Sequence, residues 1–328
     1  MVRLKEVFKE ELEIPIQKLP LLPVISIDEE ATLKEVYLLM QKNKIGCLVV
    51  TKFDVLVGII TERDFLFHIL GKIDSFDDLK VKEIMTKRPI ALKKDAKLHS
   101  LMELFNIHDF RHIPVIDEDG CPIHVISIRD LIKLIADFFP DEIKKKGVLK
   151  KWNRFHTDLQ SESFSLNRSD SSGIKGELFF QPIGKAISSH PLIIDESITI
   201  NEVLHEMQTN KKSVAIVTEY ETKIKGIITE RDFLTKVLGK IDLNSQNSSP
   251  KVVNFMTKNP ECLLSRHILS YAINNMLEGG YRNVVVVNED RQPESVLSML
   301  DIFKYVADHM TLEHHEEDIV RVREKKES

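Results

Sequence analysis

A nine-residue segment, GIITERDFL, occurs twice in this chain, at residues 58–66 and at 226–234. Extended at the same offset, the two copies share 14 of 17 positions up to Asp74 and Asp242. A second pair of segments, at 81–92 and 252–263, shares the letters MTK and a proline two residues later. Matches of this length do not arise by chance, so the sequence predicts two duplicated halves.

Each half divides again. The letters TERD at 61–64 return as SIRD at 127–130, and TERD at 229–232 returns as SMLD at 298–301. The chain therefore contains four related units, two in each half. A length of 328 residues agrees with this, because it exceeds what one hydrophobic core usually organises.

All four units show the same order of expected elements. Each begins with a helix whose apolar residues recur at i, i+3, i+4 and i+7, which predicts one buried face. These residues are Leu33, Val36, Tyr37 and Met40; Leu98, Leu101, Met102 and Phe105; Ile200, Val203, Leu204 and Met207; and Leu269, Ala272, Ile273 and Met276. Two short apolar runs joined by a polar turn follow, and they predict a hairpin.

A second amphipathic helix closes each unit, at residues 64–70, 130–138, 232–238 and 301–309. The expected fold class is α/β (α+β), with four repeats that each run strand, helix, hairpin, helix. One such unit is small for independent stability, so we expect the units to pair.

The ends of the hairpins resemble the CBS (cystathionine beta-synthase) domain family, whose repeats end in a Gly-apolar-apolar-Ser/Thr-x-x-Asp signature. The resemblance covers residues 14–139 and 183–309. It implies two pseudo-symmetric paired modules, each with two clefts, in an arrangement similar to the gamma-type regulatory subunits of nucleotide-sensing kinases. His124 and Ser295 replace the signature glycine in repeats two and four, and Leu300 replaces the arginine beside Asp301, so these repeats could bind a different form of the ligand or none.

The expected boundaries follow from the signatures and from changes in composition. A polar, Ser-rich stretch separates the halves, and a strongly charged stretch follows the last repeat. We expect an N-terminal amphipathic segment at 1–13, CBS repeats at 14–76, 77–139, 183–245 and 246–309, a linker at 140–182 and a charged tail at 310–328.

The Ser/Thr and Asp of the signature permit two interpretations. A Ser or Thr followed three residues later by an acid at the start of a helix is close to a capping box, which needs no ligand. A capping box favours Glu or Gln, however, whereas all four acids here are Asp. A carboxylate at this place could accept hydrogen bonds from a ribose, while the helix N-terminus attracts phosphate. The resemblance implies such contacts for Thr61, Asp64, Ser127, Asp130, Thr229, Asp232, Ser298 and Asp301.

Basic residues near these pairs are candidates for phosphate binding. Arg63, Arg129 and Arg231 directly precede the Asp, while in repeat four Leu300 takes this place. For Arg63 and Arg231 an exposed charge at a helix start is an equally good interpretation. The resemblance favours the remaining candidates, which precede the central strands of repeats two and four: Arg111, His112 and Arg282.

The adenine base would lie against extended apolar segments, although these segments could equally be plain core strands. The candidates are Met85, Thr86, Pro89, Ile113, Pro114, Met256 and Thr257.

Composition argues against several other classes of protein. The net charge of -5 argues against a nucleic-acid partner. The three cysteines are far apart in apolar contexts, which predicts free thiols in a reducing compartment. No apolar run approaches 18 residues and acids interrupt the apolar N-terminal stretch, so we expect no membrane span, no signal peptide and a cytoplasmic location.

No Gly-rich phosphate loop, nucleophile elbow or spaced metal-ligand set occurs in the sequence, so we expect no enzyme and no metal site. His314, His315, Glu316 and Glu317 are consecutive and would not converge on one ion.

The expected function is that of a regulatory protein that senses AMP, ADP or ATP in its clefts and transmits occupancy to a partner. No cofactor is required, although magnesium could accompany the nucleotide, and the partner would be a second copy or a regulated protein. Two alternatives stay open: an assembly scaffold with empty clefts, and a regulator of an ion transporter that responds to Mg-ATP.

Overall fold

The computed structural model describes residues 12–73, 76–139, 143, 178–188, 190–241, 243, 249–309 and 318–321. Residues 1–11, nearly all of the linker and His314–Glu317 lie outside the described residues.

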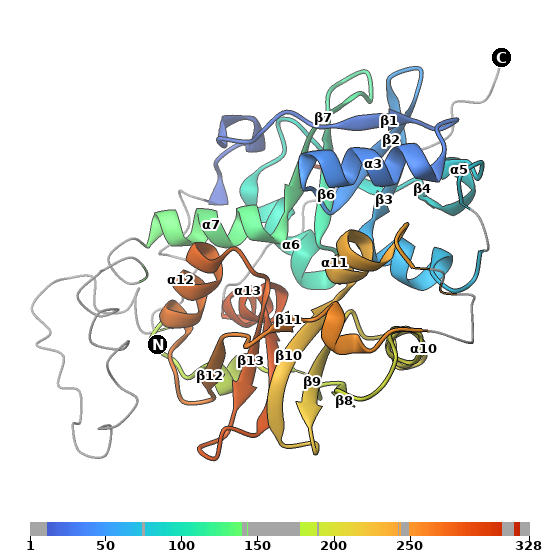
Figure 1. Ribbon diagram of the computed structural model, residues 1–328. Helices are drawn as coiled ribbons and strands as arrows, with labels where there is room; N and C mark the ends of the chain where they lie inside the picture. The colour runs from blue at the N-terminus through green and yellow to red at the C-terminus, as the bar shows by residue number, and fades with distance from the viewer. Residues whose placement is uncertain are drawn as a thin grey trace, which may run out of the picture.

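The expected order of strand, helix, hairpin and helix is confirmed in every repeat (Figure 1). Repeat one contains β1 (Ser26–Asp28), α3 (Leu33–Asn43), β2 (Cys47–Lys52), β3 (Val55–Thr61), α4 (Glu62–Asp64) and η2 (Phe65–Ile69). Repeat two contains α5 (Val81–Ile84), β4 (Thr86–Lys87), β5 (Ile90–Lys93), α6 (Leu98–Ile107), β6 (His112–Ile116), β7 (Pro122–Ser127) and α7 (Ile128–Phe138).

The second half repeats this series. Repeat three contains η3 (Ile183–Ala186), β8 (Ile193–Asp195), α10 (Ile200–Thr209), β9 (Val214–Glu219), β10 (Lys223–Thr229), α11 (Glu230–Asp232) and η4 (Phe233–Val237). Repeat four contains η5 (Val252–Asn254), β11 (Thr257–Lys258), β12 (Cys262–Leu264), α12 (Leu269–Gly279), β13 (Asn283–Val287), β14 (Pro293–Ser298) and α13 (Met299–Asp308). Repeat one begins with a short 3-10 turn, η1 (Ile16–Lys18), equivalent to η3 of repeat three.

The first helix of each repeat buries the stripe that its spacing predicts, because all sixteen residues of that stripe are buried. Helix α3 begins with a capping box in which Thr32 Oγ1 accepts from the Glu35 amide at 3.2 Å and Glu35 accepts from the Thr32 amide at 2.7 Å. Thr199 and Glu202 begin α10 in the same way. Local sequence thus fixes where these helices start.

The second helix of repeats one and three differs from the expected amphipathic α-helix. A single turn, α4 or α11, passes into a π-helix, η2 or η4. Glutamines of the opposite half bond carbonyl oxygens of the π-helices: Gln208 Nε2 donates to Leu66 at 2.7 Å and to Leu70 at 3.0 Å, and Gln41 Nε2 donates to Leu234 at 3.4 Å. The wider turns are therefore stabilised by partners distant in sequence.

The sheets mix parallel and antiparallel pairs. In each repeat the strand just before the long first helix, β1, β5, β8 or β12, runs parallel to the first strand of the hairpin, and the two hairpin strands pair antiparallel with a register shift. Strand β4 belongs to repeat two in sequence but pairs with β3 of repeat one, and β11 pairs with β10 in the same manner. These exchanged strands tie the two repeats of each half together.

The four repeats pack together through two kinds of hydrophobic core, one between sheets and one between helices. Within a half the sheets face each other, as Val49 and Leu56 pack with Ala91 and Ile116. Ile216, Ile227, Val285 and Val287 make the equivalent layer in the second half.

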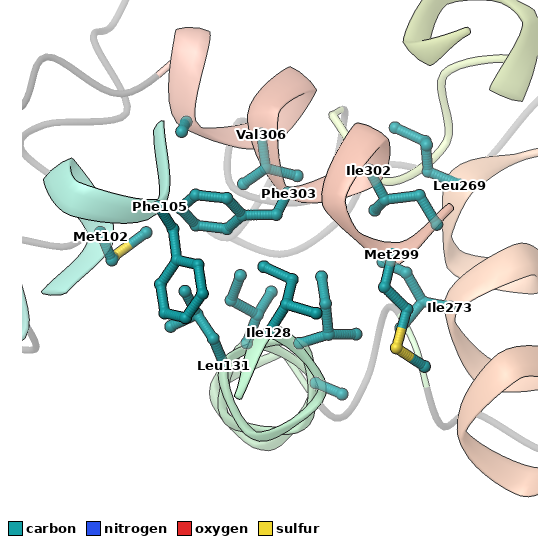
Figure 2. Close-up of a cluster of buried hydrophobic side chains, with 14 of the residues drawn as sticks. Met102, Phe105, Ile128, Leu131, Leu269, Ile273, Met299, Ile302, Phe303 and Val306 are labelled. Atoms are coloured by element: carbon teal, nitrogen blue, oxygen red, sulfur yellow. The ribbon is translucent and has the colours of Figure 1, made fainter. Parts of the chain in front are cut away.

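The helices pack across the halves, repeat one with repeat three and repeat two with repeat four. In the latter core the rings of Phe105 and Phe303 lie edge to face at 6.1 Å (Figure 2). The two halves are therefore continuous through buried helices and enclose a common central region.

The segment expected to be only a charged tail contributes a strand, β15 (Ile319–Arg321), which pairs antiparallel with β5. Before it, Asp318 accepts from the Lys97 amide at 3.2 Å and from Ser100 Oγ at 2.6 Å, so it caps the start of α6. Two apolar residues, Ile319 and Val320, form this strand within an otherwise charged segment.

Candidate functional site

Two clefts lie at equivalent places in the two halves. Cleft one has a volume of about 330 Å³ and is lined by Gly46, Ile59, Thr61, Glu62, Arg63, Asp64, Thr86, Arg88, Pro89, Ile90, Asp109, Phe110, Arg111, His112, Pro114 and Glu230. Cleft two has a volume of about 260 Å³ and is lined by Glu62, Arg111, Ile128, Ser213, Ile227, Thr229, Glu230, Arg231, Asp232, Thr257, Pro260, Glu261, Gly280, Tyr281, Arg282, Asn283, Ser298, Met299 and Leu300. Each cleft thus takes residues from both halves.

All four Ser/Thr and Asp pairs form capping boxes. In repeat one, Asp64 Oδ2 accepts from the Thr61 amide at 2.7 Å and from Thr61 Oγ1 at 2.8 Å. Equivalent bonds join Ser127 to Asp130, Thr229 to Asp232 and Ser298 to Asp301. The shorter acid therefore does make the box, and our argument that Asp disfavours capping is not supported by this geometry.

The box uses only one carboxylate oxygen, and the four aspartates differ in the other. Asp232 Oδ1 accepts from Lys236 Nζ at 2.7 Å, and Asp301 Oδ1 accepts from Ser188 Oγ at 2.7 Å. Within the described residues, Oδ1 of Asp64 and of Asp130 accepts no hydrogen bond. Capping and ligand binding are therefore compatible at Asp64 and Asp130 without breaking another contact.

The environment of Asp64 also bears on its charge. Burial raises the pKa of this carboxyl, while the hydrogen bonds from Thr61 and the nearby His68 and Arg63 oppose that rise. A partly buried carboxylate with one unused oxygen gains free energy when a donor binds that oxygen.

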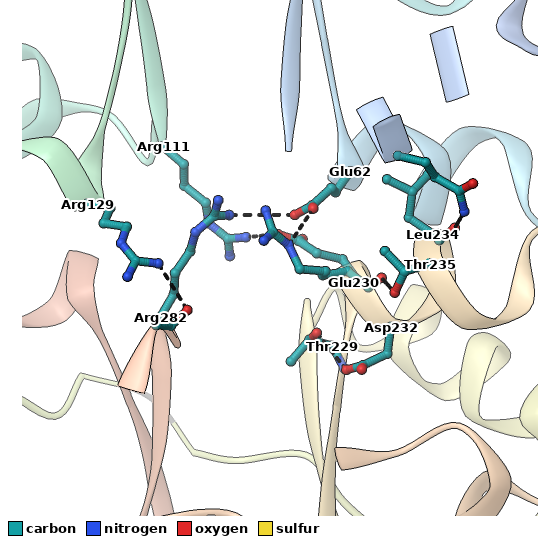
Figure 3. Close-up of polar contacts among 12 residues, drawn as sticks. Glu62, Arg111, Arg129, Thr229, Glu230, Asp232, Leu234, Thr235 and Arg282 are labelled. Atoms are coloured by element: carbon teal, nitrogen blue, oxygen red, sulfur yellow. Dashed lines mark hydrogen bonds and ion pairs between the residues drawn. The ribbon is translucent and has the colours of Figure 1, made fainter. Parts of the chain in front are cut away.

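The central arginines pair with glutamates of the opposite half (Figure 3). Arg231 Nε donates to Glu62 Oε1 at 2.7 Å, and Arg282 lies 3.5 Å from Glu62 Oε2. On the other side of the centre, Arg111 pairs with Glu230 Oε1. The side chains of Glu62 and Glu230 are only 3% and 8% exposed, so these are buried ion pairs between the halves.

Arg63 breaks this symmetry. Its repeat counterpart Arg231 contacts Glu62, but Arg63 lies over the ring of Phe67, 5.4 Å from the ring centre. It makes no ion pair with any residue in the described part of the chain. A guanidinium without a carboxylate partner therefore lies at the wall of cleft one beside Asp64.

The remaining phosphate candidates have different surroundings. His112 lines cleft one, and burial together with the charges of Arg282, Arg111 and Arg231 lowers its pKa well below the usual value. Its ring is therefore neutral near pH 7 and offers a hydrogen bond but no charge. Arg129 donates to the carbonyls of Gly280 at 3.0 Å and Leu277 at 3.4 Å, so it caps the end of α12.

The candidates for the base pocket divide between the clefts and the core. Thr86, Pro89 and Pro114 line cleft one, and Thr257 lines cleft two. Met85, Ile113 and Met256 are buried in the core and line neither cleft. Ser127, Asp130, Arg129 and Asp301 also lie outside the linings of these two clefts.

The buried methionines explain the glycine of the signature. A methyl group added at Gly58 would lie 2.2 Å from Met85 Sδ, and one added at Gly226 would lie 2.3 Å from Met256 Sδ. Both methionines immediately precede the exchanged strands β4 and β11. In repeat two, the corresponding His124 bonds the Leu22 carbonyl at 2.8 Å instead. The glycine thus serves packing of the exchanged strand.

Several cleft residues were not among our candidates. Glu62 and Glu230 are the second residues of the two TERD segments, so the sequence could have indicated them as a charged position that is the same in both copies. Phe110 and Tyr281 precede the arginines of repeats two and four and line clefts one and two. Their place in the clefts depends on which repeats lie side by side in the fold, and short sequence patterns do not show this.

Two further properties concern only the residues that the structure describes. There, no group of three His, Cys, Asp or Glu side chains is arranged to hold a metal ion. Nor does any helix in those ranges have the length and apolar character needed to cross a bilayer.

Comparison with known proteins identifies the repeats. The profile of the CBS domain matches four separate ranges, residues 16–71, 81–137, 183–239 and 252–308. The chain belongs to the CBS domain family. Its four CBS repeats form two pairs, which are the first and second halves of the chain.

Curated relatives of this CBS protein include the Meiotically up-regulated gene 70 protein of Schizosaccharomyces pombe, which is 24% identical over 308 residues, covering 86% of this chain and 41% of that protein. The CBS domain-containing protein CBSCBSPB5 of Arabidopsis thaliana is 23% identical over 304 residues, covering 88% of this chain and 53% of that protein. The chain spans about half the length of these relatives, or less.

Among solved structures, protein MJ1225 of Methanocaldococcus jannaschii, described as a proposed archaeal homologue of g-AMPK, superposes with a TM-score of 0.67 at 18% identity and covers 86% of this chain and 96% of its own. An uncharacterized conserved protein of Pyrococcus horikoshii gives a TM-score of 0.53 at 14% identity and covers 89% and 99%. At these identities the likeness establishes the fold of the CBS pairs and nothing further.

Proposed function

We propose that this CBS protein is a non-catalytic regulator that binds an adenosine nucleotide, and that cleft one is its principal site. The observation that carries the proposal is the unused oxygen of Asp64 beside the unpaired Arg63. These two groups supply an acceptor for ribose hydroxyls and a cation for phosphate, which are the contacts that the CBS signature implies.

The rest of cleft one suits the other parts of such a ligand. Ile59, Ile90, Phe110 and Pro114 provide apolar surface for a base. The volume of about 330 Å³ lies at the lower end of the range of about 300–1,000 Å³ for small-molecule sites. A cleft of this kind combines mostly apolar walls with a few polar groups, as ligand sites commonly do.

Cleft two is the weaker candidate for the same ligand. A ribose there would compete with Lys236 for Asp232 Oδ1, and a phosphate would compete with Glu62 for Arg231. Breaking each of these contacts reduces the net gain of binding. We therefore expect one tight site and a second site of lower affinity.

Occupancy would be transmitted through the boundary between the halves. Glu230 of the second half lines cleft one, so a ligand there contacts both CBS pairs. A ligand that binds one relative arrangement of the halves more tightly than another shifts the protein toward that arrangement. A partner that recognises either arrangement, whether a second copy or a regulated protein, would read the change.

The test is a titration of the purified protein with AMP, ADP and ATP by calorimetry, with and without magnesium, preceded by mass spectrometry of small molecules that copurify. We expect saturable binding of at least one adenine nucleotide and a rise in melting temperature. If none binds at millimolar concentration, the protein is better explained as an assembly scaffold. Binding that requires magnesium would favour the alternative of a regulator that responds to Mg-ATP.

A further inference from the structure

Three charged residues belong to both clefts. Glu62, Arg111 and Glu230 line cleft one and cleft two, so the clefts meet at a shared central wall. Each glutamate reaches toward arginines of the opposite half, Glu62 toward Arg231 and Arg282, and Glu230 toward Arg111. An anion that enters either cleft at this wall meets arginines that already have carboxylate partners.

The charge of each cleft follows from its lining. Cleft one has three guanidinium groups and four carboxylates, from Arg63, Arg88 and Arg111 and from Glu62, Asp64, Asp109 and Glu230. Cleft two also has three and four, from Arg111, Arg231 and Arg282 and from Glu62, Glu230, Asp232 and Glu261. Because His112 is neutral, neither cleft has an excess of positive charge. This is an unusual lining for a site that would hold several phosphates.

Among these residues, Glu230 has the strongest effect on an anion in either cleft. Its Oε1 pairs with Arg111, whereas its buried Oε2 has no hydrogen-bond partner. The residue is 7% exposed, so its charge is poorly screened by water. A ligand phosphate near Arg111 would lie close to this carboxylate and be repelled by it.

We propose that Glu230, together with Glu62, limits the ligand at the shared wall to a single phosphate group, so that a nucleoside monophosphate is preferred over the diphosphate and triphosphate. This inference rests on the proposed function and specifies its ligand. Arg63 and Arg88 are the guanidinium groups of cleft one for which the described residues contain no ion pair, and both are exposed, whereas Glu62 and Glu230 are buried. Because water screens the exposed cations more than the buried carboxylates, each further phosphate beside Glu62 and Glu230 meets more repulsion than these arginines balance.

The test substitutes Glu230→Gln, which keeps the size of the side chain and can still hydrogen-bond Arg111. Dissociation constants for AMP, ADP and ATP are measured by calorimetry in EDTA. Because Coulomb energy scales with ligand charge, we expect AMP affinity to rise about threefold and ATP affinity about tenfold or more. The ratio of the ATP to the AMP dissociation constant should therefore fall. Glu118→Gln removes an equal charge from an exposed pair with Lys94, outside both cleft linings, and should leave the ratio unchanged.

Inorganic triphosphate separates this inference from the proposed function, because it carries phosphates without adenosine. We expect it to bind Glu230→Gln at least about tenfold more tightly than the wild type. Nucleotide binding with an unchanged ATP to AMP ratio would overturn the inference and leave the proposed function standing. Tighter triphosphate binding without any nucleotide binding would overturn the proposed function and support phosphate exclusion by Glu230. If no anion binds either protein, both are wrong; if Glu230→Gln does not fold, the same measurements on Glu62→Gln decide the question.

Discussion

Asp64 can be tested for two roles, because its two carboxylate oxygens have different environments. Oδ2 accepts both bonds from Thr61, and Oδ1 has no bond in the described residues, while the residue itself lines cleft one. Replacement by Asn keeps an acceptor for Thr61 and removes the charge, whereas replacement by Ala removes both functions. The pair of variants thus separates capping of the short helix from ligand binding.

The expected magnitudes follow from these contacts. A charge-assisted bond from a ribose hydroxyl to a partly buried carboxylate contributes about 1.5–3 kcal/mol, which corresponds to about tenfold to a hundredfold in affinity. We therefore expect both Asp64→Asn and Asp64→Ala to weaken AMP binding by that factor. Loss of the cap costs about 1 kcal/mol of folding free energy and should appear only in Asp64→Ala. Asp64→Asn should be no less stable than the wild type without ligand, because burial raises the pKa of the native carboxyl.

The measurements are calorimetric titration with AMP and thermal unfolding without ligand. Asp232→Asn is the matched control, because Asp232 is in the equivalent box but Lys236 occupies its second oxygen. It should change AMP affinity at the tight site by less than about threefold, since the arrangement of cleft one is retained. The reasoning is refuted if Asp64→Asn binds AMP as the wild type does while Asp64→Ala only loses stability. Capping would then be the whole role of Asp64.

Three further predictions concern pH and packing. Because the pKa of His112 is lowered in the folded protein, stability present above about pH 6.5 is lost as pH falls below that value, by up to about 1.4 kcal/mol per pH unit. The test replaces His112 by Asn, the residue at the equivalent position 283, and measures the free energy of unfolding in urea between about pH 5 and 7.5. His112→Asn should lose less of this free energy than the wild type as the pH falls, and an equal loss would contradict a lowered pKa of His112. Gly226→Ala should lower the free energy of unfolding by about 1–3 kcal/mol, because the added methyl group would collide with Met256 and lie 2.9 Å from the Thr257 carbonyl. If urea unfolding shows no change, β11 can shift to make room. Gln208→Leu should lower the free energy of unfolding by about 1–3 kcal/mol, since two carbonyl groups of repeat one lose their hydrogen-bond donor. An unchanged melting temperature would mean that η2 does not depend on the opposite half.

The sequence identified most of the local structure because the relevant signals act over a few residues. The stripe of Leu33, Val36, Tyr37 and Met40 is buried as its spacing predicts. The hairpins and the positions of the Ser/Thr and Asp pairs also followed from short patterns. The π-helix η2 did not, since its stability involves a glutamine 142 residues away that no local pattern reveals.

The sequence alone determined that the chain holds four related repeats, because duplicated letters and apolar periodicity are properties of the chain itself. Only the tertiary structure decided which partner each charged group of the duplicated segments has. Arg63 and Arg231 lie in identical nine-residue segments, yet Arg231 contacts Glu62 of the opposite half and Arg63 lies over the ring of Phe67. The choice of partner for a charged group depends on which surfaces meet in the fold, and that information is distributed over the whole chain.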